Sequence, residues 1–156
     1  MRGESVGAAG GPVESSGYLA HGTWHGRVER HARVELPNDD SAPYAARRAA
    51  EKHLGDALDG DATATVDLLV TELVSNAVRH GRARSRGTLD MHLGVGARCV
   101  RVEVYDGGRG FALDRPAPYG EGGYGLFLVD EVASRWGVGR ADGTCVWFEL
   151  DRREES

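Results

Sequence analysis

Lysine is nearly absent from this sequence, and cysteine and long apolar runs are scarce. Lys52 is the only lysine, and no G-x-x-x-x-G-K-[ST] loop surrounds it, which excludes P-loop phosphate chemistry. The two cysteines, Cys99 and Cys145, lie within β-like runs rather than at metal-ligand spacing, so we expect buried reduced thiols. No apolar run approaches the roughly 18 residues of a membrane helix and no secretory signal is visible, so we expect a cytoplasmic protein.

Size and charge narrow the class of partner. With 156 residues, 40% of them hydrophobic, the chain is long enough for one core but not two. The formal net charge is −5, and acidic residues are spread along the chain. This argues against direct nucleic-acid binding and against an anionic membrane surface. A small molecule or another protein is the expected partner.

The composition predicts one domain with flanking segments. Residues 1–24 are rich in Gly, Ser and Ala without periodicity, which is typical of a disordered leader. The domain is expected over residues 25–151, and residues 152–156 form a polar tail. Within it, residues 30–36 alternate as a strand, and an alanine-rich helix begins after Asp40-Ser41 and ends before Asp59-Gly60.

The strongest helical pattern follows. Asp61 is the expected N-cap and Gly81 the expected stop. Apolar residues recur at about 100° per residue and predict a face that packs on a sheet. They are Val66, Leu69, Val70, Leu73, Val74 and Ala77.

Alternating segments predict the sheet. Residues 89–95 and 100–104 read as antiparallel strands joined at Gly96-Ala97, and a last hairpin turns at Asp142-Gly143. A glycine-rich stretch, residues 107–125, leads into an apolar helix. The expected fold is a two-layer α+β sandwich, with a mixed, mostly antiparallel sheet and helices on one face.

Glu72 and Asn76 lie four residues apart on the strong helix, so they differ by only about 40° around its axis. The asparagine offers a hard oxygen ligand of the kind that Mg²⁺ takes beside water and phosphates. The glutamate one turn earlier could accept a proton. Taken alone, an E-x-x-x-N pair is more often two solvent-facing helix residues, so it indicates a site only if further motifs accompany it.

A second motif begins where a valine-rich strand ends, at Asp106-Gly107-Gly108-Arg109-Gly110-Phe111. A carboxylate in a pocket accepts a hydrogen bond from the exocyclic amino group of adenine and repels the carbonyl of guanine. Gly108 and Gly110 allow a close backbone approach to a ligand. A plain glycine-rich turn is the alternative for this segment.

A third motif, Gly123-Tyr124-Gly125-Leu126, opens directly into a helix. Backbone N–H groups at a helix N-terminus bind anions, which suits a polyphosphate where lysine is lacking. The dinucleotide fingerprint G-x-G-x-x-G is also matched from Gly120, but it lacks the strand-to-helix turn of a βαβ unit.

Together these motifs resemble the GHKL, or Bergerat, ATPase superfamily. Residues 71–81 are similar to its N box, residues 106–111 to its G1 box and residues 123–126 to its G2 box. The resemblance covers about residues 34–150. Within the superfamily, the chain most resembles the bacterial anti-sigma-factor serine/threonine kinases.

The resemblance implies a fold, a ligand and partners. It implies Mg²⁺-ATP binding and phosphorylation of an anti-sigma-factor antagonist, with a sigma factor as second partner; a homodimer is compatible with it. It assigns Glu72 as general base and Asn76 as the Mg²⁺ ligand. The remaining ATP contacts that it assigns are Asp106, Gly108, Gly110, Gly123, Tyr124, Gly125 and Leu126.

Two other readings remain open at this point. In the first, ATP binding orders a lid over residues 113–122 and gates a protein-binding surface without turnover. In the second, the chain is the catalytic half of a split histidine kinase, which the lack of a helical hairpin with a phosphoacceptor histidine disfavours.

Overall fold

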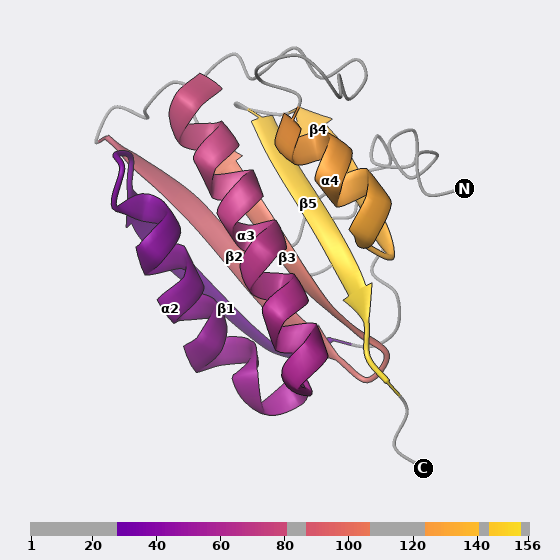
Figure 1. The fold of residues 1–156 in the computed structure, drawn as a ribbon. Helices are drawn as coiled ribbons and strands as arrows, with labels where there is room; N and C mark the ends of the chain where they lie inside the picture. Colours follow the sequence, from indigo (N-terminus) through magenta and orange to yellow (C-terminus); the bar gives the residue numbers. More distant parts are fainter. Residues whose placement is uncertain (1–27, 81–86, 107–123, 141–143, 154–156) are drawn as a thin grey trace.

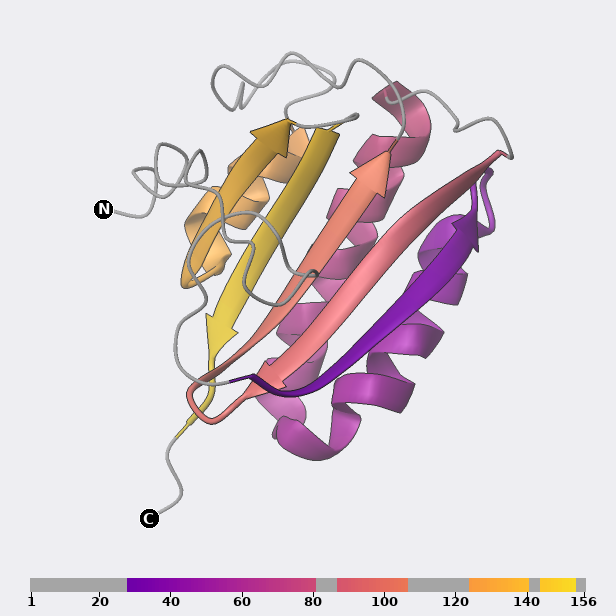
Figure 2. The ribbon, with the colours of Figure 1, turned by 180° about the vertical axis from the view of Figure 1, so that it is seen from behind.

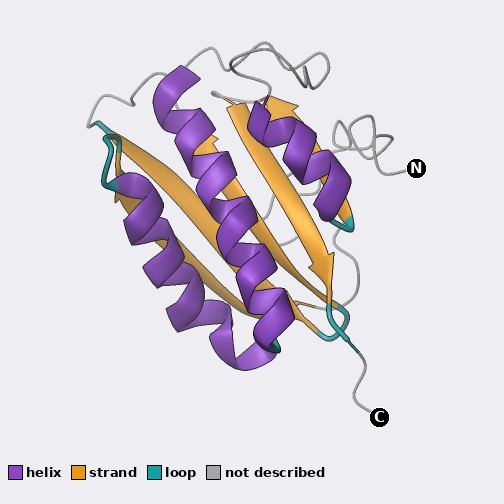
Figure 3. Cartoon of the chain, viewed as in Figure 1, coloured by secondary structure: helices purple, strands orange, loops and turns teal. Residues whose placement is uncertain are grey.

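The structure is a computed structural model, and it describes residues 28–80, 87–106, 124–140 and 144–153. The expected leader, Gly81 and the turn at residues 142–143 lie outside the described residues. A five-stranded sheet carries helices on one face (Figures 1 and 3), which confirms the predicted two-layer α+β architecture. No described helix is long and apolar enough to cross a membrane.

The strands alternate as the sequence predicts. They are β1 (Val28–Pro37), β2 (Thr88–Gly96), β3 (Cys99–Asp106), β4 (Arg135–Arg140) and β5 (Thr144–Asp151). Their order across the sheet is β1-β2-β3-β5-β4. Every neighbouring pair among these strands is antiparallel. The sheet was predicted to be mixed and mostly antiparallel, and its described part contains no parallel pair.

The helices follow the predicted pattern closely. They are α2 (Ala42–Leu54), α3 (Gly60–His80) and α4 (Tyr124–Val132), with a single 3-10 turn, Gly55–Ala57, after α2. Pro43 occupies the first turn of α2, where a missing N–H costs nothing. The Asp39 carboxylate accepts the backbone N–H of Ser41 at 2.8 Å just before this helix.

The N-cap of α3 differs from the expectation. The Oδ1 atom of Asp59, rather than a group of Asp61, accepts the backbone N–H of Ala62 at 2.8 Å. The carbonyl of Asp59 also accepts the N–H of Thr63 at 2.8 Å, so the helix begins at Gly60, two residues earlier than a cap at Asp61 would place it. The prediction of Asp61 as the cap was wrong because glycine at the first helical position does not prevent helix propagation from Asp59.

The apolar arc of α3 packs on the sheet as predicted. All six of its residues belong to the main core, together with alternating residues of the strands such as Val102, Leu93 and Phe148. Burying a side chain of this size contributes about 1.5–3 kcal/mol. The core therefore fixes α3 lengthwise over the sheet and sets where its C-terminal turn lies.

Arg152 makes several hydrogen bonds at the end of the sheet that lies opposite the C-terminal turn of α3. Its Nη1 donates to the carbonyl of Gly96 at 2.6 Å, and its backbone N–H donates to Arg98 at 2.8 Å. Its Nε also reaches the carbonyl of Ala57 at 3.2 Å. Arg152, which the sequence assigns to the polar tail, thus ties the β2–β3 turn to the 3-10 turn that follows α2.

Candidate functional site

Three elements that carry the predicted motifs meet at the same edge of the sheet, where α3 and β3 end and α4 begins. Figures 1 and 2 show the C-terminal end of α3, the C-terminal end of β3 and the N-terminal end of α4 together at this edge. Asn76 lies one turn before the last residue of α3, Asp106 is the last residue of β3, and Tyr124 is the first residue of α4. Elements far apart in the sequence thus bring the motifs together.

Asn76 is buried, with only 2% of its surface exposed. Its Nδ2 atom has no hydrogen-bond partner among the described residues. A buried polar group without a partner costs about 1–3 kcal/mol. The structure therefore excludes a solvent-facing Asn76, and its Nδ2 can donate to an acceptor oxygen of a ligand, whereas Oδ1 is the atom that would bind a metal.

Glu72 stands one turn earlier on α3 and is half-buried. The preceding residue, Thr71, accepts a hydrogen bond from Nη1 of Arg47 at 2.9 Å and donates to the carbonyl of Asp67 at 2.7 Å. These contacts tie α2 to the turn of α3 that carries Glu72. Sequence reasoning missed Arg47, because nothing in its spacing distinguishes it from the neighbouring Arg48.

Asp106 is 1% exposed at the end of β3, opposite Thr144 of β5. The alternating Val100, Val102 and Val104 face the core, so the same alternation turns Asp106 toward the helix side of the sheet. A carboxyl group buried there is costly unless a charge or hydrogen-bond donor meets it. This burial at the end of a strand is compatible with the role of ligand acceptor that the motif predicts for Asp106.

The start of α4 supplies backbone rather than side-chain groups. Leu126 is 1% exposed and packs in the main core, so only its backbone is available to a ligand. Tyr124 and Gly125 occupy the first turn, where N–H groups lack helical partners. At the other end of α4, Nε1 of Trp136 donates to Asp130 at 2.8 Å and attaches the helix to β4.

The ends of the helices set the electrostatics of this edge. The N-terminus of α4 carries a partial positive charge that favours phosphate, whereas the C-terminus of α3 carries a partial negative charge that favours a cation. Asn76 lies in this last part of α3. Its buried amide fits a Mg²⁺ that takes one protein oxygen and its other ligands from phosphates and water.

Three predicted glycines, Gly108, Gly110 and Gly123, lie outside the described residues. Among the residues that are described, no group of three or more His, Cys, Asp or Glu side chains could hold a metal ion. Within the described part of this edge, Asn76 is the predicted metal ligand, and the phosphates of a nucleotide and water would supply the other oxygens.

A different hollow of about 320 Å³ lies between β1 and the end of α2. Arg30, Lys52 and His53 stand at its rim, over Leu93 and Val95. It adjoins the carbonyl end of α2, which disfavours an anion, and Arg30 is paired with Asp56 at 2.7 Å. We therefore do not assign this hollow to the functional site.

Comparison with known structures supports the fold. The structure of the RsbU and RsbW domains of Rv1364c from Mycobacterium tuberculosis is similar, with a TM-score of 0.61 and 20% sequence identity. The match covers 81% of this chain but only 34% of that chain. Comparison with curated protein sequences finds no match.

A match to a protein-family model identifies the family of this chain. The family model for the histidine kinase-like ATPase domain matches residues 36–150, which runs from the end of β1 through β5. This range includes the ends of α3 and β3 and the start of α4 that meet at the site. The chain therefore belongs to the histidine kinase-like ATPase family, as the resemblance to GHKL ATPases predicts.

Proposed function

We propose that this chain binds Mg²⁺-ATP at the edge formed by α3, β3 and α4, and that it is a serine/threonine kinase acting on an anti-sigma-factor antagonist. The observation that carries ATP binding is the pair of buried polar side chains, Asn76 and Asp106, at the edge where α4 begins. The kinase activity and the partners rest on the resemblance to anti-sigma-factor kinases. The cytoplasm is the compartment that this function requires.

Each group at the edge has one task in this proposal. The Asp106 carboxylate accepts a hydrogen bond from the amino group of adenine and repels guanine. The first N–H groups of α4 bind phosphate oxygens. Asn76 provides an oxygen ligand to Mg²⁺, which would neutralise phosphate charge when bound.

Glu72 is the proposed base for the substrate hydroxyl. It is half-buried, so a protein substrate can reach it, and it lies one turn from Asn76 on α3. Phosphoryl transfer asks the protein mainly for positioning and charge neutralisation, and a positioned base adds to these. The contact from Arg47 to Thr71 restrains the turn that holds it.

The decisive experiment follows a γ-labelled phosphate. The protein is incubated with Mg²⁺ and labelled ATP, alone and with candidate antagonist proteins from the same genome. We expect the label on a serine or threonine of one antagonist. Glu72→Gln should abolish this transfer while ATP binding, measured by calorimetry, stays unchanged.

A matched variant controls for the lost charge. Asp67→Asn removes a carboxylate from the same helix about 140° away around its axis, and it should transfer phosphate as the unaltered chain does. Retained transfer in Glu72→Gln would overturn the base assignment. ATP binding with no labelled protein would favour an ATP-gated binding module instead, and failure to bind ATP would overturn the whole proposal.

A further inference from the structure

Two histidines meet on the face of the sheet away from the helices. All three described helices lie on one face, and Figure 2 shows the opposite face, which no described helix or strand covers. His31 of β1 and His92 of β2 point to this face, because their neighbours Ala32 and Leu93 pack in the core under the helices and side chains alternate along a strand. Nε2 of His31 lies 3.2 Å from Nδ1 of His92, and both residues are half-buried.

The two rings are arranged nitrogen to nitrogen. Their centroids are 5.3 Å apart and their planes meet at 41°, so the rings do not stack and the facing nitrogens lie between them. Bonds from zinc to imidazole nitrogen are about 2.0–2.1 Å long, and tetrahedral geometry then places two such nitrogens about 3.3 Å apart on one ion. The observed 3.2 Å separation is therefore close to that of two imidazoles that share a metal ion.

We propose that His31 and His92 bind a divalent transition-metal ion between these two nitrogens. Imidazole is a ligand that suits zinc, nickel and copper, and water supplies the remaining ligands in an open site. Without a metal, one of the facing nitrogens donates its proton to the other. On metal binding this proton moves to the outer nitrogen of the same ring, so both facing lone pairs meet the metal and each ring keeps one N–H.

One positive and one negative side chain flank the histidine pair. Arg33 lies directly opposite His92 and carries a charge that repels a cation. Its Nη2 donates to Asp90 at 2.8 Å, so a carboxylate on the same face offsets that charge. Burial lowers the pKa of His92 to about 4 and also lowers the pKa of His31. Protons therefore do not compete with a metal for these rings at pH 7.

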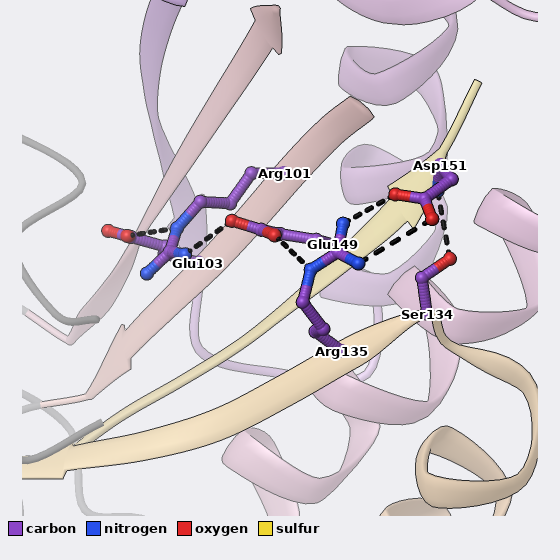
Figure 4. Close-up of polar contacts among 6 residues, drawn as sticks. All are labelled: Arg101, Glu103, Ser134, Arg135, Glu149 and Asp151. Atoms are coloured by element: carbon purple, nitrogen blue, oxygen red, sulfur yellow. Dashed lines mark hydrogen bonds and ion pairs between the residues drawn. The ribbon is translucent and has the colours of Figure 1, made fainter. Parts of the chain in front are cut away.

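The carboxylate opposite His92 on the other side is engaged elsewhere. Glu103 of β3 is paired with His92 in the sheet, and it accepts Nε of Arg101 and the hydroxyl of Tyr105, each at 2.8 Å. Arg101 also donates to Glu149 at 2.8 Å, within the network of ion pairs that Figure 4 shows. Glu103 therefore belongs to this network, and the metal site has two protein ligands. This agrees with the lack of a three-ligand group among the described residues.

A metal at this place would join the outermost described strand to the rest of the sheet. β1 stands at one end of the described strand order and pairs with β2. His31 and His92 are 61 positions apart in the sequence, so only the folded sheet brings their nitrogens together. An ion that binds the folded chain in preference to the unfolded chain raises its stability. The site is also separate from the edge where α3, β3 and α4 meet, so it does not depend on nucleotide.

Titration with Zn²⁺, Ni²⁺ and Cu²⁺ tests the proposal on the full chain, without nucleotide and without a histidine tag. Calorimetry measures the affinity of each ion for the unaltered chain, for His31→Gln and for His92→Gln, since glutamine keeps a neutral hydrogen-bonding side chain. We expect at least one of the three ions to bind, and each substitution to weaken it by about tenfold or more, as even the loss of a group that orients a ligand costs about that much. Mg²⁺, which prefers oxygen ligands, should not compete.

Other histidines of the chain provide the controls. His53→Gln on α2, and the double variant His21→Gln, His25→Gln outside the described residues, should bind the ion as the unaltered chain does. An ion at about 100 times its dissociation constant should raise the unfolding midpoint by about 5 °C or more, and this rise should be absent in His31→Gln and His92→Gln. If circular dichroism shows that His92→Gln does not fold, His31→Gln on the outermost strand decides. No binding of any of the three ions, undiminished binding in the folded variants, or loss of binding only in the control variants would overturn the proposal.

Discussion

Arg101 and Glu149 form an ion pair from which water is excluded, with Nη1 and Oε2 2.8 Å apart and both side chains 0% exposed. Glu149 also accepts Nε of Arg135, so one carboxylate serves two guanidinium groups. Charges buried in this way are costly to leave unpaired. Substitutions at this pair, on the face of the sheet away from the helices, should therefore destabilise the protein about as much as substitutions in the apolar core.

Removing Glu149 should destabilise the protein strongly. Glu149→Ala removes one of the two carboxylates to which Arg101 donates, and it deprives Arg135 of its buried partner. We expect the free energy of unfolding to fall by about 3–5 kcal/mol, as for other buried pairs that lose one partner. Urea denaturation measures this. Glu35→Ala, on the exposed part of the same face, should cost no more than about 1 kcal/mol, and equal losses in the two variants would contradict the burial of the network.

A pair of histidines on the same face predicts acid sensitivity. Nε2 of His31 lies 3.2 Å from Nδ1 of His92. Burial, followed by the charge on His31, lowers the pKa of His92 to about 4; Arg33 lowers it further, while Asp90 opposes the shift. Burial also lowers the pKa of His31. Between pH 4 and the ordinary histidine pKa of about 6.5, the unfolded chain therefore binds a proton at His92 that the native chain does not.

The free energy of unfolding should therefore fall as the pH is lowered from about 6.5 toward 4, and stay level above 6.5. His92→Gln keeps a neutral hydrogen-bonding side chain and removes this titration. Urea unfolding at pH 7.5 and pH 5 measures the difference for both chains. We expect a smaller loss in the variant, and an equal loss would show that His92 does not titrate in this window.

The N-cap of α3 can be tested with two neighbouring aspartates. Asp59→Ala removes the acceptor of the Ala62 N–H and should cost about 1 kcal/mol in urea unfolding. Asp61→Ala should cost only about a few tenths of a kcal/mol, since Asp61 caps no N–H in the described contacts and the variant loses only its favourable charge near the helix N-terminus. Asp59→Asn retains a capping oxygen, so it separates the cap from the weak exposed pair with Arg153. Equal losses for Asp59→Ala and Asp61→Ala would contradict the assignment of Asp59 as the cap.

Periodicity was enough to predict the core layer. The apolar arc of α3 and the alternating valines of β3 are strong local patterns, and their burial follows directly from them. The same alternation does not predict which residues are buried on the face of the sheet away from the helices. Arg101 and Glu149 occupy positions that a solvated strand face would also give to charged residues, and only the three-dimensional pairing of β3 with β5 shows that they meet.

The candidate site is a prediction from motifs and not from local contacts. Glu72, Asn76 and Asp106 stand out because three motifs occur in one order, although each motif alone is weak. The burial of Asn76 depends on how α3 rotates against the sheet, and the contact of Arg47 with Thr71 depends on how α2 packs beside α3. Both follow from tertiary packing, which no window of sequence contains.

Asn76 should be needed for ligand binding and hardly for stability. Because its Nδ2 makes no hydrogen bond to the described protein, Asn76→Ala should change the free energy of unfolding by less than about 1 kcal/mol. Calorimetry should show Mg²⁺-ATP affinity reduced by about tenfold or more. Leu73→Ala, one turn earlier in the core, provides the converse control and should cost about 2–5 kcal/mol. A large stability loss in Asn76→Ala would instead make Asn76 a structural residue.

Asp106 should decide which base is bound. The carboxylate accepts the amino group of adenine, and it meets the carbonyl of guanine with repulsion. Asp106→Asn offers an N–H donor at the same place and nearly the same volume, so the buried 1%-exposed site should still fold. We expect ATP affinity to fall by about tenfold to a hundredfold and GTP affinity to rise toward it, since an unmade hydrogen bond to a charged group is worth about 1.5–3 kcal/mol. Calorimetric titration with each nucleotide in Mg²⁺ measures the ratio. If Asp106→Asn kept the full preference for ATP, the adenine contact would have to lie elsewhere on the chain.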